Sequence, residues 1–210
     1  MSKKYEFLLD EFQVNLFFAS IRSKKEIISL LMKSLKLISA YEKPVHKLVK
    51  GKMILSVDKM SRLFFFSETK YFSINFPFFI NDSGDKIIFY SNNISDIDSA
   101  ITSDVLSLIS NDASLMSDSI FEFIDPISEI AVYKDEFWSF FRELILFEDG
   151  YIRYDHDDNK KRVHATKHPI NHYDICYSSN ATFKIGLNNK IGHDKFMDLV
   201  NINTDCHFIK

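Results

Sequence analysis

The sequence predicts an α+β fold, with one or more antiparallel sheets and with the N-terminal helices packed on one face. Two observations carry this prediction. Residues 1–43 show apolar side chains at helical spacing, whereas 45–92 and 150–190 consist of short β-branched and aromatic segments between polar turns. No internal repeat, low-complexity tract or linker separates these parts. We therefore expect a single α+β domain over 1–210, with a helical N-terminal part and a histidine-rich C-terminal sheet.

Helices are expected in five places. Residues 4–21 and 24–40 each carry apolar side chains at helical spacing, and Ser23 with Glu26 forms a capping-box pattern at the start of the second helix. The same periodicity predicts helices over Asn93–Ser110, capped by Ser95, over Asp135–Phe147, which should end at the turn Asp149–Gly150, and over Asp194–Val200. Residues 113–132 fit neither period, so no element is predicted there.

Strands are expected in two groups. Residues 45–92 should form a three- or four-stranded antiparallel meander, with a strong turn at Asn81–Asp85. Pro77 should break the third strand or place it at an edge, because proline has no backbone N–H to donate. The second group should follow the order strand, polar loop, strand, turn, strand, over Tyr151–His156, Ile170–Tyr177 and Thr182–Leu187, with the turn at Ser178–Asn180.

The composition limits which partners and which cell compartment we expect for the protein. A net charge of −3 gives no general attraction to nucleic acid, which leaves only a local basic patch for that purpose. The two cysteines, Cys176 and Cys206, are too few for a disulfide framework and lack metal-ligand spacing. The first residues do not resemble a secretory signal, and no apolar run approaches the ~20 residues that span a bilayer. We expect a reduced, cytoplasmic protein without a membrane partner.

Candidate functional residues concentrate in Tyr151–Asp174, which holds four of the seven histidines. Alternation along a strand puts Arg153 and Asp155 on one face, opposite Ile152 and Tyr154. In the next two strands the same rule groups His172, Asp174 and Cys176, and then Thr182 and Lys184. If the three strands are neighbours, one face of the sheet presents all of these polar side chains together.

Two interpretations of that face stay open. It is either the solvated face of a half-buried sheet with cross-strand ion pairs, or a catalytic cluster. In the second case His172 or His168 exchanges a proton, Asp155 orients a histidine or holds a metal, and Arg153 and Lys184 stabilise anionic charge. Such a set suits phosphodiester cleavage. The neighbouring basic run Lys160, Lys161 and Arg162 suits contacts with a phosphate chain, although charge runs are usually solvated surface.

A bound metal is the competing use of these residues. His168 and His172 have the spacing of a helical zinc pair, but Pro169 predicts an extended segment, in which such positions lie ~13 Å apart. Asp155, Asp157 and Asp158 offer carboxylate ligands for magnesium, with Asp155 and Asp157 as the candidates, although three acidic residues in a turn are more often solvated or capping groups. A divalent metal ion is thus a candidate cofactor, and no other cofactor is indicated.

The C-terminal residues also resemble a known family. The pattern is Arg153-Tyr154-Asp155 in a strand, His168-Pro169-x-x-His172 opening the next, and Lys184-Ile185 after a turn. It is similar to that of an uncharacterised bacterial family catalogued as domain of unknown function 2290, over about the last 60 residues. Lys184 and Gly186 stand where that family usually has arginine and proline, and lysine lacks the two-pronged geometry of arginine. The resemblance implies a bacterial protein from a mobile or phage-defence locus.

Two hypotheses of different classes follow. The first is an intracellular effector of a phage-defence or toxin-type system that cleaves phosphodiester bonds in nucleic acid. The second is a non-enzymatic accessory protein of a defence or toxin–antitoxin system, which binds a protein partner from the same operon and whose polar residues form a buried ion-pair network. An open cleft at Arg153, Asp155 and His172 favours the enzyme, whereas a sealed and mutually paired cluster favours the accessory protein. The oligomeric state is left open.

Overall fold

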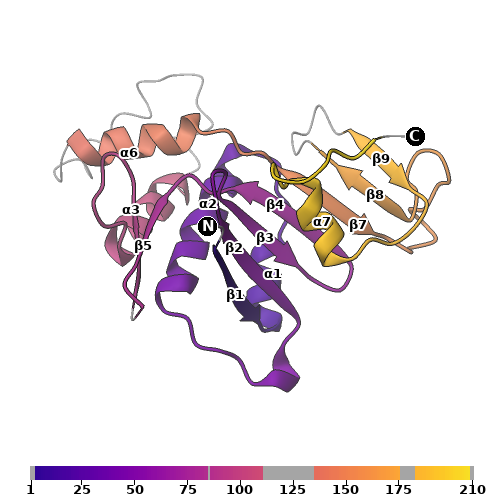
Figure 1. Ribbon diagram of the computed structural model, residues 1–210, viewed down its shortest axis with the longest axis horizontal. Coiled ribbons are helices and arrows are strands. Elements are labelled where there is room, and N and C mark those ends of the chain that lie inside the picture. Colours follow the sequence, from indigo (N-terminus) through magenta and orange to yellow (C-terminus); the bar gives the residue numbers. More distant parts are fainter. Residues whose placement is uncertain (1–2, 85, 111–134, 176–182, 209–210) are drawn as a thin grey trace. The chain divides into compact units, whose positions relative to one another are not determined.

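The computed structural model describes residues 3–84, 86–110, 135–175 and 183–208, and it confirms an α+β fold with an antiparallel sheet (Figure 1). Contacts between Cα atoms divide the chain into two compact units. The first comprises Met1–Arg22, Lys43–Phe76 and Asp149–Lys210, and the second comprises Ser23–Glu42 and Pro77–Glu148. Because two contact units can belong to one folding domain, the single domain over 1–210 stays a prediction.

The first unit is built on a seven-stranded antiparallel sheet of order β1-β2-β3-β4-β7-β8-β9. Its strands are β1 (Lys3–Leu9), β2 (Gly51–Val57), β3 (Arg62–Phe66), β4 (Lys70–Asn75), β7 (Ile152–His156), β8 (Asn171–Asp174) and β9 (Lys184–Leu187). The predicted meander is present as β2, β3 and β4, and both the break at Pro77 and the three C-terminal strands are confirmed. A short 3-10 helix, His46–Leu48, precedes β2.

The helix predicted over 4–21 is wrong in its first half, which forms β1, and only α1 (Glu11–Phe17) is helical. Alternate residues Phe7 and Leu9 are buried, and β1 pairs with β2 along its whole length. Asp10 then starts the helix, since its side chain accepts a 2.8 Å hydrogen bond from the Gln13 amide and the Gln13 side chain accepts one from Asp10 N–H. Long-range strand pairing thus overrides the local helical spacing, and this capping box marks the boundary.

A short helix packs on each face of the sheet. On one face, Phe17 of α1 packs on Phe65 with ring centres 5.4 Å apart, and Phe18 packs edge-on against Phe72. On the other, α7 (His193–Leu199) inserts the fully buried Phe196. The core on this second face consists of Ile54, Phe64, Phe66, Tyr71, Tyr154, Tyr173, Ile191 and Phe196.

The second unit contains α2 (Lys24–Ser39), the hairpin β5 (Phe79–Asp82) and β6 (Ile87–Tyr90), α3 (Ser99–Ser110) and α6 (Asp135–Leu146). The predicted α2 and α6 are confirmed. Ser23 is the N-cap residue of α2, and its hydroxyl donates to the Glu26 side chain rather than capping the backbone. The packing of α2 on the seven-stranded sheet stays a prediction, because the two belong to different units.

The helix α3 begins later than predicted. It starts at Ser99 rather than Asn93, because Asp98 and not Ser95 supplies the cap, its carboxylate accepting a 2.9 Å hydrogen bond from Ile101 N–H. Residues 113–132 and the predicted turn Ser178–Asn180 lie outside the described residues. In the described part of the chain, no helix has both the length and the apolar composition needed to cross a membrane.

Candidate functional site

The register of three strands brings the predicted polar residues onto one face of the sheet. Arg153 of β7 lies opposite Asp174 of β8, and Asp155 lies opposite His172. Asp174 in turn lies opposite Lys184 of β9. We call this group, together with Lys70 of the adjacent strand β4, the polar cluster: Lys70, Arg153, Asp155, His172, Asp174 and Lys184. Strand alternation places it on the face opposite the α7 core, since Tyr154 and Tyr173 point to that core.

Lys70 is a member of the cluster that the sequence did not predict. It lies opposite Asp155 in the pairing of β4 with β7, two strands that are adjacent in the sheet but far apart in the chain. Burial lowers the pKa of the Lys70 ammonium, and the nearby Asp155 carboxylate opposes that shift. Alternation alone predicts which residues of one strand share a face, whereas the neighbour of β7 is decided by the topology of the whole sheet.

Arg153 ties the two carboxylates of the cluster together. Its Nε lies 2.9 Å and its terminal nitrogen 2.8 Å from Asp155 Oδ2, and the same terminal nitrogen donates to Asp174 Oδ2. Burial alone would lower the pKa of Arg153, but Tyr151, Asp155 and Asp174 together raise it above its usual value. Arg153 is therefore a fixed cation that bridges β7 and β8.

His172 is held in one tautomer. Its Nδ1 lies 2.8 Å from the Pro169 carbonyl oxygen, which can only accept a hydrogen bond, so we assign the ring proton to Nδ1. Burial lowers the pKa of His172, with the Pro169 hydrogen bond and the two aspartates opposing it, so the ring is neutral at pH 7. The Nε2 lone pair therefore faces the other members of the cluster.

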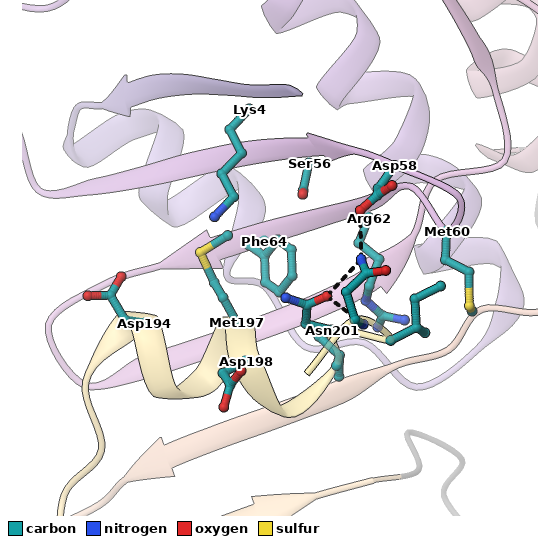
Figure 2. Close-up of a pocket in the computed structure, with 13 residues that line it drawn as sticks. Lys4, Ser56, Asp58, Met60, Arg62, Phe64, Asp194, Met197, Asp198 and Asn201 are labelled. Carbon is teal, nitrogen blue, oxygen red and sulfur yellow. Dashed lines mark hydrogen bonds between the residues drawn. The ribbon is translucent and has the colours of Figure 1, made fainter. Parts of the chain in front are cut away.

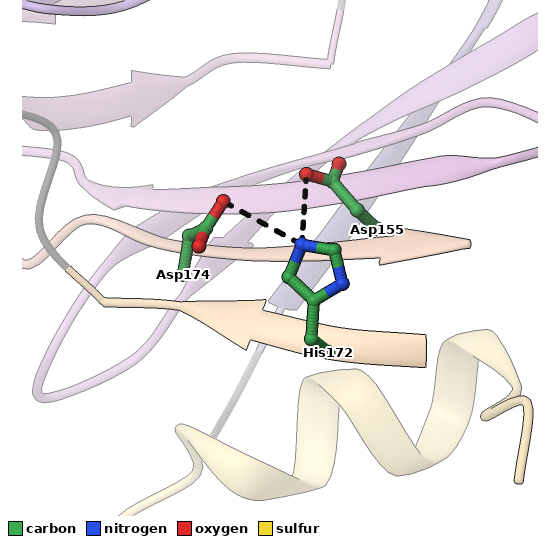
Figure 3. Close-up of side chains that lie close together, drawn as sticks. All are labelled: Asp155, His172 and Asp174. Carbon is green, nitrogen blue, oxygen red and sulfur yellow. Dashed lines mark ion pairs between the residues drawn. The ribbon is translucent and has the colours of Figure 1, made fainter. Parts of the chain in front are cut away.

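The surroundings of that lone pair are a cation and two carboxylates. His172 Nε2 lies 3.3 Å from Lys184 Nζ, 3.8 Å from Asp155 Oδ2 and 3.9 Å from Asp174 Oδ2; Figure 3 shows the ring turned toward both carboxylates. One potential ligand atom from each of Asp155, His172 and Asp174 lies within 4.8 Å of the others. The Oδ1 atoms of both aspartates are buried and accept no hydrogen bond in the described part of the structure.

This donor set fits a divalent metal ion. A histidine that binds a metal through Nε2 commonly donates its Nδ1–H to a backbone carbonyl, as His172 does to Pro169. One imidazole with two carboxylates suits the borderline divalent ions such as Mn²⁺, Fe²⁺ or Zn²⁺ better than it suits Ca²⁺, which prefers oxygen alone. Lys184 Nζ, 3.5 Å from Asp174 Oδ1, lies on the side where such an ion would bind.

His168 lies beside the cluster. Its ring packs edge-on against that of His172, with centres 4.6 Å apart, and its buried Nδ1 has no hydrogen-bond partner in the described residues. The predicted separation of ~13 Å is therefore wrong. The physical reason is that β8 begins only at Asn171, and the chain bends before it, so that His172 bonds back to Pro169.

The other predicted site residues are not part of the converging group that the structure describes. Asp157 pairs with Arg162 at 3.2 Å and is not among the three residues whose ligand atoms converge. Lys160, Lys161 and Arg162 are exposed in the loop between β7 and β8. Cys176 and Thr182, which alternation assigned to the same face, lie outside the described residues.

Burial within the cluster is uneven. The side chain of His172 is fully buried and that of Asp174 is 2% exposed, whereas Asp155 is 15%, Arg153 25% and Lys184 30% exposed. The cluster thus has a closed base and a rim of cations that solvent can reach.

No protein-family model, curated protein or solved structure matched the chain. The resemblance of its C-terminal pattern to the bacterial family therefore stays a prediction.

Proposed function

We propose that this protein is a metal-dependent phosphodiesterase that cleaves nucleic acid. The observation that carries the proposal is the convergence of the neutral His172 Nε2 with the carboxylates of Asp155 and Asp174 within 4.8 Å, beneath a rim of cations. A bound divalent ion in such a place polarises a phosphoryl oxygen and lowers the pKa of a bound water. Both effects serve hydrolysis of a phosphodiester.

The residues divide into two roles on this proposal. Asp155, His172 and Asp174 hold the ion, and the more exposed cations Arg153 and Lys184 receive the phosphate. Lys184 has a second part in this arrangement. Because its ammonium lies 3.3 Å from His172 Nε2, an arriving cation would repel it from the ligands and toward the phosphate. The exposed Lys160, Lys161 and Arg162 would contact the nucleic-acid backbone beyond the scissile bond.

The cellular setting is part of the proposal. The C-terminal pattern resembles a bacterial family, and on that resemblance we propose a cytoplasmic effector of a phage-defence or toxin-type system. A partner protein encoded beside it would then control when it acts.

The direct test is cleavage of labelled RNA and DNA by the purified protein with Mn²⁺ or Mg²⁺, and with a chelator. Asp174→Asn and His172→Ala should each lower the cleavage rate by at least about a hundredfold, as expected for the loss of a metal ligand. Asp157→Asn is the matched control, because it removes a neighbouring carboxylate that lies outside the converging group. Circular dichroism confirms that each variant is folded. Cleavage that is unchanged in Asp174→Asn, or that persists with the chelator, contradicts the proposal.

A second function is favoured by the enclosure of His172. Its side chain is fully buried, and the charged side chains around it are paired with one another, as the accessory-protein hypothesis requires. On that account the cluster joins β7, β8 and β9, and the protein binds a partner without catalysis. No cleavage with any metal, together with a loss of stability in Asp174→Asn, would decide for this second function.

A further inference from the structure

A cavity of about 470 Å³ lies in the first unit, between the strands and α7, on the face of the sheet opposite the polar cluster (Figure 2). Phe64 and Arg62 of β3 line it from the sheet, and Met197 lines it from α7. Its volume falls within the ~300–1,000 Å³ of ordinary small-molecule sites. The feature that distinguishes this cavity is the burial of the charged Arg62 in its wall.

Arg62 is a buried cation that no carboxylate of the described residues pairs with. Only 7% of the residue is exposed, and its Nε donates to Ser73 Oγ at 2.9 Å. Its two terminal nitrogens donate to Asn75 Oδ1 and to the Gly150 carbonyl. All three acceptors are neutral, and no ion pair joins Arg62 to a carboxylate among the described residues. Burial lowers the pKa of Arg62 to about 10, so the guanidinium is still protonated at neutral pH.

In the described part of the chain, the hydrogen bonds of Arg62 use three of its five N–H groups. A guanidinium has five N–H groups, and the three bonds above use Nε–H and one N–H on each terminal nitrogen. One N–H on each terminal nitrogen is left over. Two N–H groups of one guanidinium can bond to the two oxygens of a carboxylate or of another planar oxyanion. A buried charge with such a pair is costly to fold unless an anion completes it.

The charges of the other residues that line the cavity determine which anions fit it. Lys4 adds one positive charge, but the aspartates at positions 58, 194 and 198 also line the cavity, so its side chains sum to a net negative charge. A phosphate dianion would be repelled by these carboxylates more strongly than a monoanion. Phe64 and Met197 offer an apolar surface beside Arg62. Among anions, the cavity therefore favours one with a single negative charge and an apolar body over a dianion.

We propose that this cavity binds a small organic carboxylate, whose carboxylate group bonds to the two remaining N–H groups of Arg62 and whose apolar part packs on Phe64 and Met197. The site is independent of the proposed phosphodiesterase activity, because it lies on the other face of the sheet and shares no residue with the polar cluster.

Calorimetric titration of the full chain with acetate, 4-methylpentanoate and 3-phenylpropionate tests the proposal. The two carboxylates with apolar bodies should bind, and 3-phenylpropanol, which has the same body without the charge, should bind at least tenfold more weakly. Inorganic phosphate should not bind at the same site. Absence of binding by every carboxylate overturns the proposal, as does equal binding of the alcohol or binding of phosphate alone.

Two variants connect the binding to this cavity. Arg62→Gln should weaken the binding of 3-phenylpropionate at least tenfold. Because Arg62 also bonds to three neighbours, Ser56→Phe provides a second variant that fills the cavity from β2 and leaves Arg62 in place. Ser107→Phe makes the same change at an exposed position of α3 and should bind the ligand as the natural chain does. Binding that survives Ser56→Phe unchanged places the ligand elsewhere and overturns the proposal.

Discussion

At the scale of single residues, a hydrogen bond and burial together determine the protonation of His172. The Pro169 carbonyl fixes its proton on Nδ1, and burial keeps the ring neutral, so that Nε2 presents a lone pair to two carboxylates. A lone pair and two anions repel one another unless a cation lies among them. Lys184 Nζ supplies one at 3.3 Å, and a divalent ion would supply a stronger one. A cation between His172 Nε2 and the two carboxylates is thus needed in both states: Lys184 supplies it without a metal, and the divalent ion would supply it in the proposed metal site.

The neutral state of His172 makes the stability of the protein depend on pH. Because the pKa of His172 is lowered in the folded state, the unfolded chain binds this proton first as the pH falls below about 6.5. The stabilisation is complete above that pH and is lost as the pH falls through the folded-state pKa. The slope from one proton is at most about 1.4 kcal/mol per pH unit.

Urea unfolding between pH 8 and pH 5 measures this effect. The natural chain should lose stability on acidification, and His172→Gln should show a shallower slope. His193, whose pKa burial also lowers, contributes equally to both proteins. His46→Gln, at an exposed position, is the control and should keep the slope of the natural chain. Identical slopes for His172→Gln and the natural chain would contradict a buried neutral imidazole.

At the scale of elements, the sequence predicted features that depend on neighbouring residues in the chain, and it did not predict features that depend on strand pairing. Alternation grouped Arg153, Asp155 and His172 on one face because a strand places every second side chain on the same side. It could not find Lys70, whose place opposite Asp155 depends on the pairing of β4 with β7, two strands that residues 77–148 separate in the sequence. The helix predicted over 4–21 is wrong in its first half for the same reason. Residues 3–9 form the strand β1 because they pair with β2, and their own periodicity does not show this. The sequence did not single out Arg62, because the burial of one side chain depends on the packing of the whole fold.

The entry of the chain into β7 depends on Gly150. It has φ +53°, a conformation that costs other residues about 1 kcal/mol or more, and a Cβ added there would lie 2.6 Å from the Asn75 side chain. That side chain accepts a hydrogen bond from Arg62. Gly150→Ala should therefore lower the free energy of unfolding by about 1–3 kcal/mol, measured by urea denaturation. A variant as stable as the natural chain would show that this turn is not required.

At the scale of the whole first unit, one sheet carries different chemistry on its two faces. The face toward α7 is aromatic and contains the Arg62 cavity, whereas the opposite face carries the polar cluster at β7, β8 and β9. Strand alternation makes this separation possible, because neighbouring residues such as Arg153 and Tyr154 point to opposite sides. The two proposed sites can therefore be altered one at a time by substitution.

Titration of the purified protein with Mn²⁺ in a calorimeter tests the central claim most directly, because it needs no substrate. We predict that the natural chain and Asp157→Asn bind one ion with similar affinity, and that Asp174→Asn binds it at least tenfold more weakly while still folded by circular dichroism. The contrary result is a natural chain that binds no Mn²⁺, or an Asp174→Asn variant that binds it as tightly as the natural chain does.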